Sequence, residues 1–113
     1  MCGIIGINSI KPVSSSIINS LKKLEYRGYD SAGIATLLDG SINEVKCEGR
    51  VNNLEKNSLV QNMQGTIGIG HVRWATHGLP NSINAHPHSS INVSVVHNGI
   101  IENSTLLKKF LVS

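Results

Sequence analysis

MCGIIGI, residues 1–7, places a cysteine directly behind the initiator methionine and a short apolar run behind that cysteine. Initiator methionine is normally removed when the second residue is small, which would make Cys2 the first residue of the mature chain. An α-amine has a reference pKa of about 7.7–8.0, so near neutral pH it can accept a thiol proton. Cys2 is therefore a candidate nucleophile activated by its own amine. The alternative interpretation is that Cys2 is a small apolar residue at the start of a core strand, with no catalytic role.

The composition is that of one small globular domain: 113 residues, 40% of them hydrophobic, with a mean hydropathy of +0.01. No apolar run approaches the roughly 20 residues of a membrane-spanning helix, so we expect no membrane contact. No basic segment precedes CGIIGI, so we expect a cytoplasmic location without a signal peptide, and reduced thiols at Cys2 and Cys47. The net charge is +3, but the basic residues are scattered and aromatic residues are few, which argues against nucleic-acid binding.

Apolar periodicity and turn residues predict strands and helices in mixed order, which favours a layered α+β fold. The expected strands are 3–8, 31–38, 41–49, 65–74 and 91–97, and the expected helices are 12–27, 51–63 and 102–112. Serines 14–16 are candidate N-caps of the first helix and Gly28 is its candidate C-cap. Asp39-Gly40 predicts a tight hairpin. The aperiodic stretch 75–90 predicts a long functional loop.

Each expected helix has an apolar side. These sides consist of Ile17, Ile18, Leu21 and Leu24 in the first helix, Val51, Leu54 and Leu59 in the second, and Leu106, Leu107, Phe110 and Leu111 in the third. The glycines of GTIGIGHVRW predict that another part of the backbone or a helix approaches this strand closely.

Two further segments carry groups suited to binding and catalysis. In GHVRWATHG, Arg73 stands at a strand end and offers a bidentate fork for a carboxylate, although it could equally pair with a surface acid. In VVHNGIIEN, the Asn98 amide and the Gly99 backbone N–H could form an oxyanion hole, each donor contributing about 2.7–4 kcal/mol to transition-state stabilisation. An ordinary Asn-Gly turn is the alternative for this pair.

The five histidines and the glycine-rich segments give little support to a metal or a cofactor. His86 and His88 in NAHPH could face alike, but neither HExxH nor CxxC spacing occurs, so we expect no metal. His71 and His97, inside expected strands, are interpreted as hydrogen-bonded core histidines. The sequence has no GxxxxGK[ST] motif, and GTIGIG is not followed by the helix of a dinucleotide site, so no cofactor is expected.

Taken together, the ordered segments MCGIIGI, LEYRGYDSAGIA, GHVRWATHG, NAHPH and VVHNGIIEN resemble the start of the class II glutamine amidotransferase domain. EYRGYDSAG and RWATHG are similar to its hexosamine branch in particular. The resemblance implies an N-terminal-nucleophile hydrolase fold, an αββα sandwich, and an enzyme that takes L-glutamine.

The resemblance also implies roles for individual residues. Cys2 would attack the glutamine side-chain amide and release ammonia through a thioester, with Asn98 and Gly99 holding the oxyanion. Arg73 would bind the glutamine α-carboxylate, and Trp74, Thr76 and His77 would line the pocket. Arg27 would support the nucleophile from beside it.

Residues 1–113 would thus be the N-terminal part of such a domain. In the family, the domain continues to an aspartate that binds the α-ammonium group of glutamine, and sugar-isomerase domains that bind fructose 6-phosphate and dimerise follow later. None of these matches a segment of this sequence. We therefore expect a truncated or split chain with little activity alone. A second polypeptide completing the domain and a non-catalytic remnant are the open alternatives.

Overall fold

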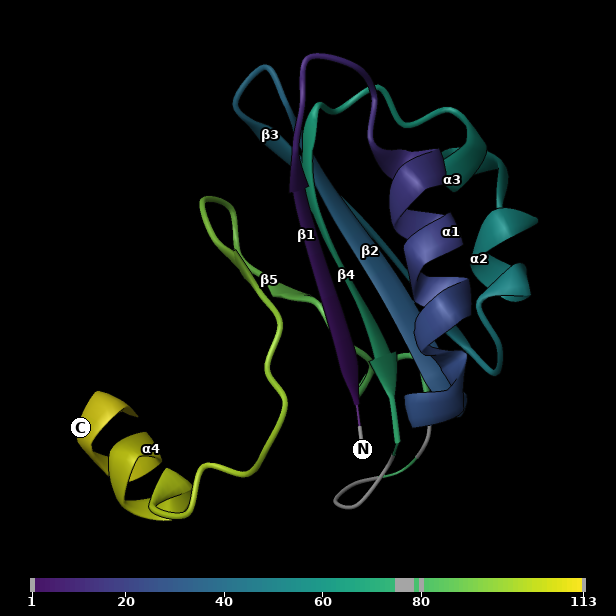
Figure 1. Cartoon of the computed structure of the whole chain (residues 1–113). Helices are drawn as coiled ribbons and strands as arrows, with labels where there is room; N and C mark the ends of the chain where they lie inside the picture. The colour runs from purple at the N-terminus through teal and green to yellow at the C-terminus, as the bar shows by residue number, and fades with distance from the viewer. Residues whose placement is uncertain (1, 75–78, 80, 113) are drawn as a thin grey trace.

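The computed structural model of the chain, which describes residues 2–74, 79 and 81–112, is built on one antiparallel sheet (Figure 1). Its strands are β1 (Gly3–Asn8), β2 (Ser31–Leu38), β3 (Ser41–Glu48) and β4 (Ile67–Arg73), in the order β1-β4-β2-β3. The predicted strands at 3–8, 31–38, 41–49 and 65–74 are confirmed to within two residues. On the face that the helices cover, β2 carries the buried Ala32 and Ile34, and β4 carries the buried Val72 beside two glycines.

Helices pack on one face of this sheet (Figure 1). They are α1 (Ser14–Leu24), the 3-10 turn η1 (Glu25–Arg27), α2 (Asn52–Glu55) and α3 (Ser58–Gln61). The predicted apolar side of α1 is confirmed, because Ile17, Ile18 and Leu21 are all buried against the sheet. Burying a side chain of this size contributes about 1.5–3 kcal/mol, so this layer supplies most of the core.

Two glycines of β4 let α1 approach the sheet closely, as the glycine-rich sequence predicts. A Cβ added at Gly68 or at Gly70 would lie 2.6 Å from an atom of Ile17, closer than real carbon contacts. The helix therefore lies directly on the β4 backbone, and Ile17 fills the space that two side chains would otherwise take.

The predicted N-caps of the first helix are wrong, whereas its predicted C-cap residue does end the helical segment. The N-cap is Val13, which has no side-chain cap bond, and serines 14–16 form the first turn instead. Val13 is 1% exposed and its N–H donates to the Gly65 carbonyl, so core packing rather than a hydroxyl cap decides where the helix starts. Gly28 is the C-cap of the 3-10 turn that continues α1, and its N–H donates to the Glu25 carbonyl, but its φ of 171° is extended rather than left-handed.

Between β2 and β4 the predicted hairpin turn is confirmed, but the predicted single helix is divided into two. Asp39 and Gly40 have φ values of 49° and 79°, the left-handed pair that a tight hairpin turn requires. The predicted helix 51–63 is instead two short helices, because the Asn57 side chain accepts the Leu59 N–H and starts a new one. This break changes the helical phase, so Val60 is buried and Leu59 is exposed.

The face of the sheet opposite the helices is covered over part of its area by the segment 81–98. Of the predicted strand 91–97 only β6 (Ser94–Val95) forms, paired with β5 (His88–Ser89). Ala85 and Pro87 are buried where this segment crosses the sheet at Gly33, whose missing side chain makes room for the His86 carbonyl. Farther along the same face, Ile4, Leu37 and Ile67 are about 40% exposed.

The last helix, α4 (Ser104–Val112), confirms the predicted element but none of its residues is buried. It lies away from the sheet at the end of the extended segment 96–103 (Figure 1). Consequently the predicted apolar side, which includes Phe110 and Leu111, faces outward. Within the described residues, no helix is long and apolar enough to cross a membrane.

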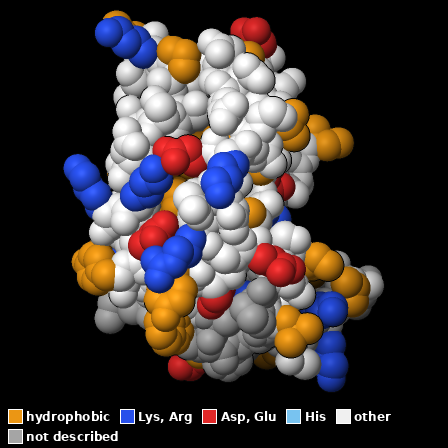
Figure 2. Space-filling model, turned by 90° about the vertical axis from the view of Figure 1, so that its right-hand side faces the viewer, with side chains coloured by type: hydrophobic (Ala, Val, Ile, Leu, Met, Phe, Trp, Pro, Cys, Tyr) orange, Lys and Arg blue, Asp and Glu red, His pale blue; other side chains and the backbone are white. Residues whose placement is uncertain are grey.

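Acidic and basic side chains alternate over the helix-covered side of the molecule (Figure 2). Two of the contacts there are ion pairs, Lys22–Glu55 at 2.7 Å and Arg50–Glu25 at 3.0 Å. On this side the excess of positive charge therefore does not gather into a basic stripe.

Candidate active site

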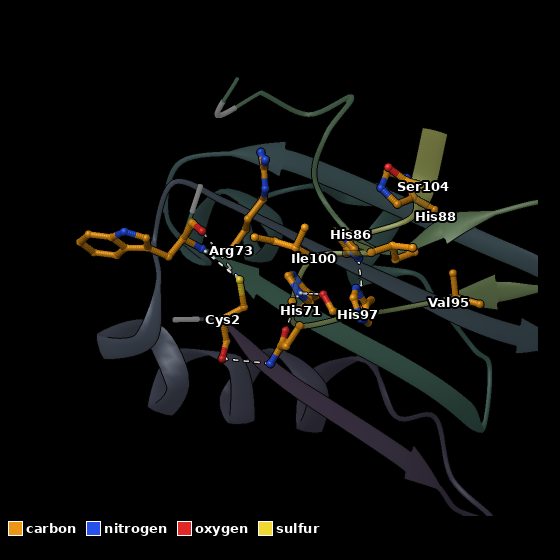
Figure 3. A pocket seen from close by; sticks show the side chains of 13 residues that line it. Cys2, His71, Arg73, His86, His88, Val95, His97, Ile100 and Ser104 are labelled. Atoms are coloured by element: carbon orange, nitrogen blue, oxygen red, sulfur yellow. Dashed lines mark hydrogen bonds between the residues drawn. The ribbon is translucent and has the colours of Figure 1, made fainter. Parts of the chain in front are cut away.

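Cys2 lies where β1 begins and β4 ends, because the register pairs Gly3 with Val72 in antiparallel strands. This pairing puts the thiol beside the backbone that follows Arg73. The Trp74 N–H donates to Cys2 Sγ at 3.4 Å, and the thiol faces the Trp74 carbonyl oxygen at 3.9 Å. The side chain is partly exposed and lines a cavity of about 770 Å³ (Figure 3).

The carbonyl oxygen of Cys2 accepts two side-chain hydrogen bonds. Arg27 Nε donates to it at 3.0 Å from the 3-10 turn, and Asn98 Nδ2 donates to it at 3.1 Å from the segment after β6. Hydrogen bonds from a charged donor contribute about 1.5–3 kcal/mol. The backbone of the candidate nucleophile is therefore held from two separate parts of the chain.

Gly28 and Tyr29 hold the peptide that contacts the thiol. A Cβ at Gly28 would lie 2.5 Å from the Arg73 carbonyl carbon and 2.6 Å from the Trp74 nitrogen, so only glycine fits there. The Tyr29 and Trp74 rings meet edge to face, with centroids 5.8 Å apart, and the indole remains 47% exposed. The EYRGY segment thus places a turn, a glycine and a ring around one end of β4.

Arg73 is 8% exposed and lines the same cavity as Cys2. Its Nη1 donates to the Leu79 carbonyl at 2.8 Å, which ties the loop after β4 to the strand end. Thr76 and His77, the other predicted pocket residues of this loop, lie outside the described residues. The structure therefore places Arg73 and Trp74 with Cys2 but does not describe the remaining loop partners.

Asn98 and Gly99 line the cavity from the extended segment that follows β6. Gly99 has a φ of 137°, a conformation that side-chain-bearing residues rarely adopt. The Asn98 amide uses both ends: Nδ2 donates to Cys2, and Oδ1 lies 2.9 Å from His71 Nε2. One of the two amide hydrogens serves the Cys2 carbonyl, which leaves the second for a ligand in the cavity.

Histidines form the floor of the cavity (Figure 3). The rings of His71 and His86 stack with centroids 4.4 Å apart, and His88 lies 4.6 Å beyond His86. Burial, which disfavours the charged form, is the main cause that lowers the pKa of His86 to about 4, and it also lowers the pKa of His71 and of His88. These side chains are therefore neutral near pH 7.

One of the two predicted core histidines is confirmed and the other is wrong. His71 is fully buried and hydrogen-bonded, whereas His97 is exposed and lies outside any strand. The strand ends at Val95, so His97 belongs to the extended segment that leaves the sheet. Among the described residues, no group of three or more His, Cys, Asp or Glu side chains could hold a metal ion.

No family model matches the sequence. Over its full length the chain is 59% identical to the glutamine–fructose-6-phosphate aminotransferase (isomerizing) of Clostridium acetobutylicum, and 99% of it matches that of Mesorhizobium japonicum at 54% identity. The chain spans only 19% and 18% of these relatives' lengths.

Two solved structures agree with the sequence matches. The glutamine phosphoribosylpyrophosphate amidotransferase of B. subtilis superposes with a TM-score of 0.81 at 27% identity. An allosteric regulatory enzyme of purine biosynthesis superposes with a TM-score of 0.84 at 28% identity. Each covers 99% of this chain, which in turn covers 25% of each solved chain. The chain matches the N-terminal part of glutamine–fructose-6-phosphate aminotransferases.

The likeness to these two solved structures confirms the expected α+β fold of the N-terminal-nucleophile hydrolases. In this chain the helix layer and the first sheet are present as expected, and the short β5–β6 pair lies on the opposite face.

Sequence reasoning missed three neighbours of the candidate site. Tyr29 and His86 give no signal of their own, because their contacts with Trp74 and His71 join segments far apart in the chain. His71 carries a signal, since side chains two apart on a strand point to the same face. A histidine two residues before Arg73 therefore had to face the same cavity.

Proposed function

We propose that this chain supplies the nucleophile of a glutaminase site, in which Cys2 hydrolyses L-glutamine to glutamate and ammonia. The observation that supports this most directly is the meeting of Cys2, Arg73, Asn98 and Gly99 around one cavity, although they come from three separate segments. Each group has a separate use in amide hydrolysis: a nucleophile, a carboxylate ligand and an oxyanion site.

The first step forms a thioester. Once Met1 is removed, the free α-amine of Cys2 takes the thiol proton and the sulfur attacks the carbonyl carbon of the glutamine side chain. A C–S bond forms and the carbonyl oxygen becomes an oxyanion, stabilised by the Asn98 amide and the Gly99 N–H. The α-ammonium then returns its proton to the amide nitrogen, the C–N bond breaks and ammonia leaves.

The second step restores the enzyme. Water adds to the thioester carbonyl with the α-amine as its base, a C–O bond forms, the C–S bond breaks and the thiol is protonated again. Glutamate leaves, so one water is consumed for each ammonia produced. The same oxyanion donors serve both steps.

Glutamine is held by its α-carboxylate in this proposal. The Arg73 guanidinium offers two parallel N–H donors to a carboxylate, and the Leu79 carbonyl fixes one end of that side chain. Trp74 lines the same cavity, and Arg27 steadies the Cys2 backbone. Thr76 and His77, which lie outside the described residues, are proposed as further glutamine-binding residues.

The relatives are named for fructose 6-phosphate, and we propose that the ammonia released here serves the amination of that sugar phosphate in the cytoplasm. Residues 1–113 form the N-terminal part of the glutaminase domain in this view. The sugar-binding and dimer-forming domains, or a second polypeptide completing the glutaminase domain, contribute from outside these residues.

A non-catalytic chain is the second candidate. The outward apolar side of α4 and the partly exposed Ile4, Leu37 and Ile67 favour it, because contiguous apolar surface often marks an interaction site. This candidate predicts a chain that binds no glutamine whatever the state of Cys2.

The test is Cys2-dependent release of glutamate by the purified chain, after intact-mass measurement has shown that Met1 is absent. A glutamine analogue with a reactive diazoketone in place of the side-chain amide adds a second reading, because it labels the nucleophile without turnover. We expect labelling of Cys2 that excess L-glutamine suppresses and Cys2→Ala abolishes, with Cys47→Ala as the matched control that retains it. Labelling of neither cysteine, together with no glutamate release, would favour the non-catalytic chain.

A further inference from the structure

The hydrogen-bond partners of His71 Nε2 determine whether this nitrogen carries a hydrogen. Nε2 lies 3.2 Å from the His97 backbone carbonyl and 2.9 Å from Asn98 Oδ1 (Figure 3). A backbone carbonyl can only accept, so Nε2 must carry a hydrogen. The Asn98 atom that faces the same nitrogen must then be the oxygen rather than the NH2 group.

The opposite end of the Asn98 amide gives an independent check of this orientation. Nδ2 faces the Cys2 carbonyl at 3.1 Å, and this second backbone carbonyl also accepts only. Two fixed acceptors, the carbonyls of His97 and Cys2, therefore require the same orientation of one side-chain amide. His71 links the two, because the same Nε2–H faces the His97 carbonyl and the Asn98 oxygen.

The surroundings of the His71 ring keep the hydrogen on Nε2, where it can be donated. The side chain is fully buried under the stacked ring of His86, and Nδ1 has no hydrogen-bond partner among the described residues. Protonating Nδ1 would bury an N–H without a partner, which costs about 1–3 kcal/mol. His71 therefore stays neutral with its hydrogen on Nε2.

We propose that His71 is a positioning residue of the glutaminase site, whose Nε2–H holds the Asn98 amide with its NH2 group toward Cys2. The inference rests on the proposed function, in which this NH2 group stabilises the oxyanion. Without the His71 donor the amide can rotate by half a turn, which puts its oxygen against the Cys2 carbonyl and the developing oxyanion. The Asn98 side chain would then present an oxygen that repels the oxyanion, instead of the NH2 group that stabilises it.

Two substitutions distinguish the contribution of the His71 N–H donor from that of the His71 ring. His71→Phe keeps a planar ring that can stack on His86 but removes the donor. His71→Gln loses the ring but can place an amide N–H close to the Nε2 position. Loss of one oxyanion donor lowers kcat about 10²–10³-fold. We expect His71→Phe to lose about 10–100-fold in kcat with KM within about threefold of the parent, since Arg73 is unchanged. His71→Gln should recover most of that loss.

Nitrogen-15 NMR of the unmodified chain tests the inference without turnover. We expect the neutral tautomer with the hydrogen on Nε2 of His71, and two Asn98 side-chain NH2 signals, of which the one for the hydrogen on the Cys2 carbonyl exchanges more slowly with water. In His71→Phe these NH2 signals should exchange faster, while the backbone spectrum stays that of a folded chain.

Each outcome bears on one proposal or the other. A hydrogen on Nδ1 of His71, or a folded His71→Phe with unchanged kcat and unchanged Asn98 signals, would overturn the positioning role. A chain that shows the expected tautomer and Asn98 exchange but releases no glutamate would overturn the proposed function and leave the geometric role intact. If His71→Phe does not fold, the tautomer of the parent and the Asn98 exchange of His71→Gln decide.

Discussion

At the scale of single residues, the site is organised around the backbone of Cys2 as much as around its sulfur. Arg27 and Asn98 donate to the carbonyl, and the Trp74 N–H donates to Sγ. These contacts fix both ends of the residue before any substrate arrives, which reduces the ordering that binding would otherwise require. The thiol depends in turn on the position of the Arg73–Trp74 peptide.

Gly28 controls that peptide, so we expect Gly28→Ala to disturb both stability and the site. The added methyl group would lie 2.5 Å from the Arg73 carbonyl carbon, and both backbones must shift to admit it. Overpacking of this kind typically destabilises by about 1–3 kcal/mol. Urea denaturation measures this loss, and the diazoketone analogue should label Cys2 more slowly.

Gly6→Ala is the matched control for Gly28→Ala. A Cβ at Gly6 has no neighbour nearer than 3.9 Å, and this glycine does not have a positive φ. We expect this variant to be as stable as the parent or about 0.4–1 kcal/mol more stable, because alanine restricts the unfolded chain. Equal destabilisation by the two substitutions would contradict the steric argument.

The two thiols should differ in reactivity. Cys47 packs against the core, and burial raises the pKa of its thiol despite hydrogen bonds from the backbone. Since the thiolate is the reactive species, iodoacetamide at pH 8 should modify Cys2, which lines the cavity, several-fold faster than Cys47. Peptide mapping by mass spectrometry gives both rates. In denaturant the two rates should converge, and equal rates in the folded chain would show that Cys47 is not protected.

At the scale of elements, the packing of α1 on β4 is the contact on which the sheet depends. Ile17 is fully buried over Gly68 and Gly70, so Ile17→Ala would leave a cavity that these glycines cannot fill. We expect a loss of about 2–5 kcal/mol in the free energy of unfolding, measured by urea denaturation.

Leu59→Ala in α3 is the control, because this side chain is 67% exposed. A surface substitution of this kind changes stability by about 0.5 kcal/mol or less. If Leu59→Ala cost as much as Ile17→Ala, the phase of α3 in the structure would be wrong and the single helix predicted from the sequence would be favoured.

The elements differ in how far the sequence could predict them, and the difference has physical causes. The strands around Ile5, Ile34 and Val72 and the turn at Asp39-Gly40 follow from local pattern and backbone preference, and they were predicted correctly. The start of α1 was not, because burial of Val13 outweighs the capping preference of the adjacent serines.

The candidate site shows the same division. Cys2, Arg73, Asn98 and Gly99 were singled out by residue type and motif, and the structure brings them to one cavity. The contacts of Tyr29 with Trp74 and of His71 with Asn98 depend on how separate segments cross, which periodicity does not encode.

At the scale of the whole molecule, one layer of helices covers one side of the sheet and the histidine-rich segment covers part of the other. The second layer is held by few apolar side chains, chiefly Ala85 and Pro87. It also contains neutral histidines packed close to Arg73 and to one another. Proton uptake by this layer should therefore govern the acid stability of the molecule.

We expect the free energy of unfolding to fall as the pH drops from about 6.5 to about 4. The pKa of His86 is lowered from 6.5 to about 4 by burial and then by the charges of His71, His88, Arg73 and His97. Between these pH values the unfolded chain binds a proton that the folded chain does not, so stability rises with pH across the window and levels off above it. The lowered pKa values of His71 and His88 act in the same direction.

His86→Asn isolates this effect from the carboxyl groups that titrate at the acid end of the same range. The His97 N–H donates to His86 Nδ1 at 3.2 Å, and an asparagine oxygen can occupy nearly the same place without taking up a proton. Urea denaturation at a series of pH values should therefore give a shallower decline below pH 6.5 for this variant than for the parent. Parallel declines would mean that the layer of histidines does not set the acid limit, and that carboxyl groups elsewhere in the chain do.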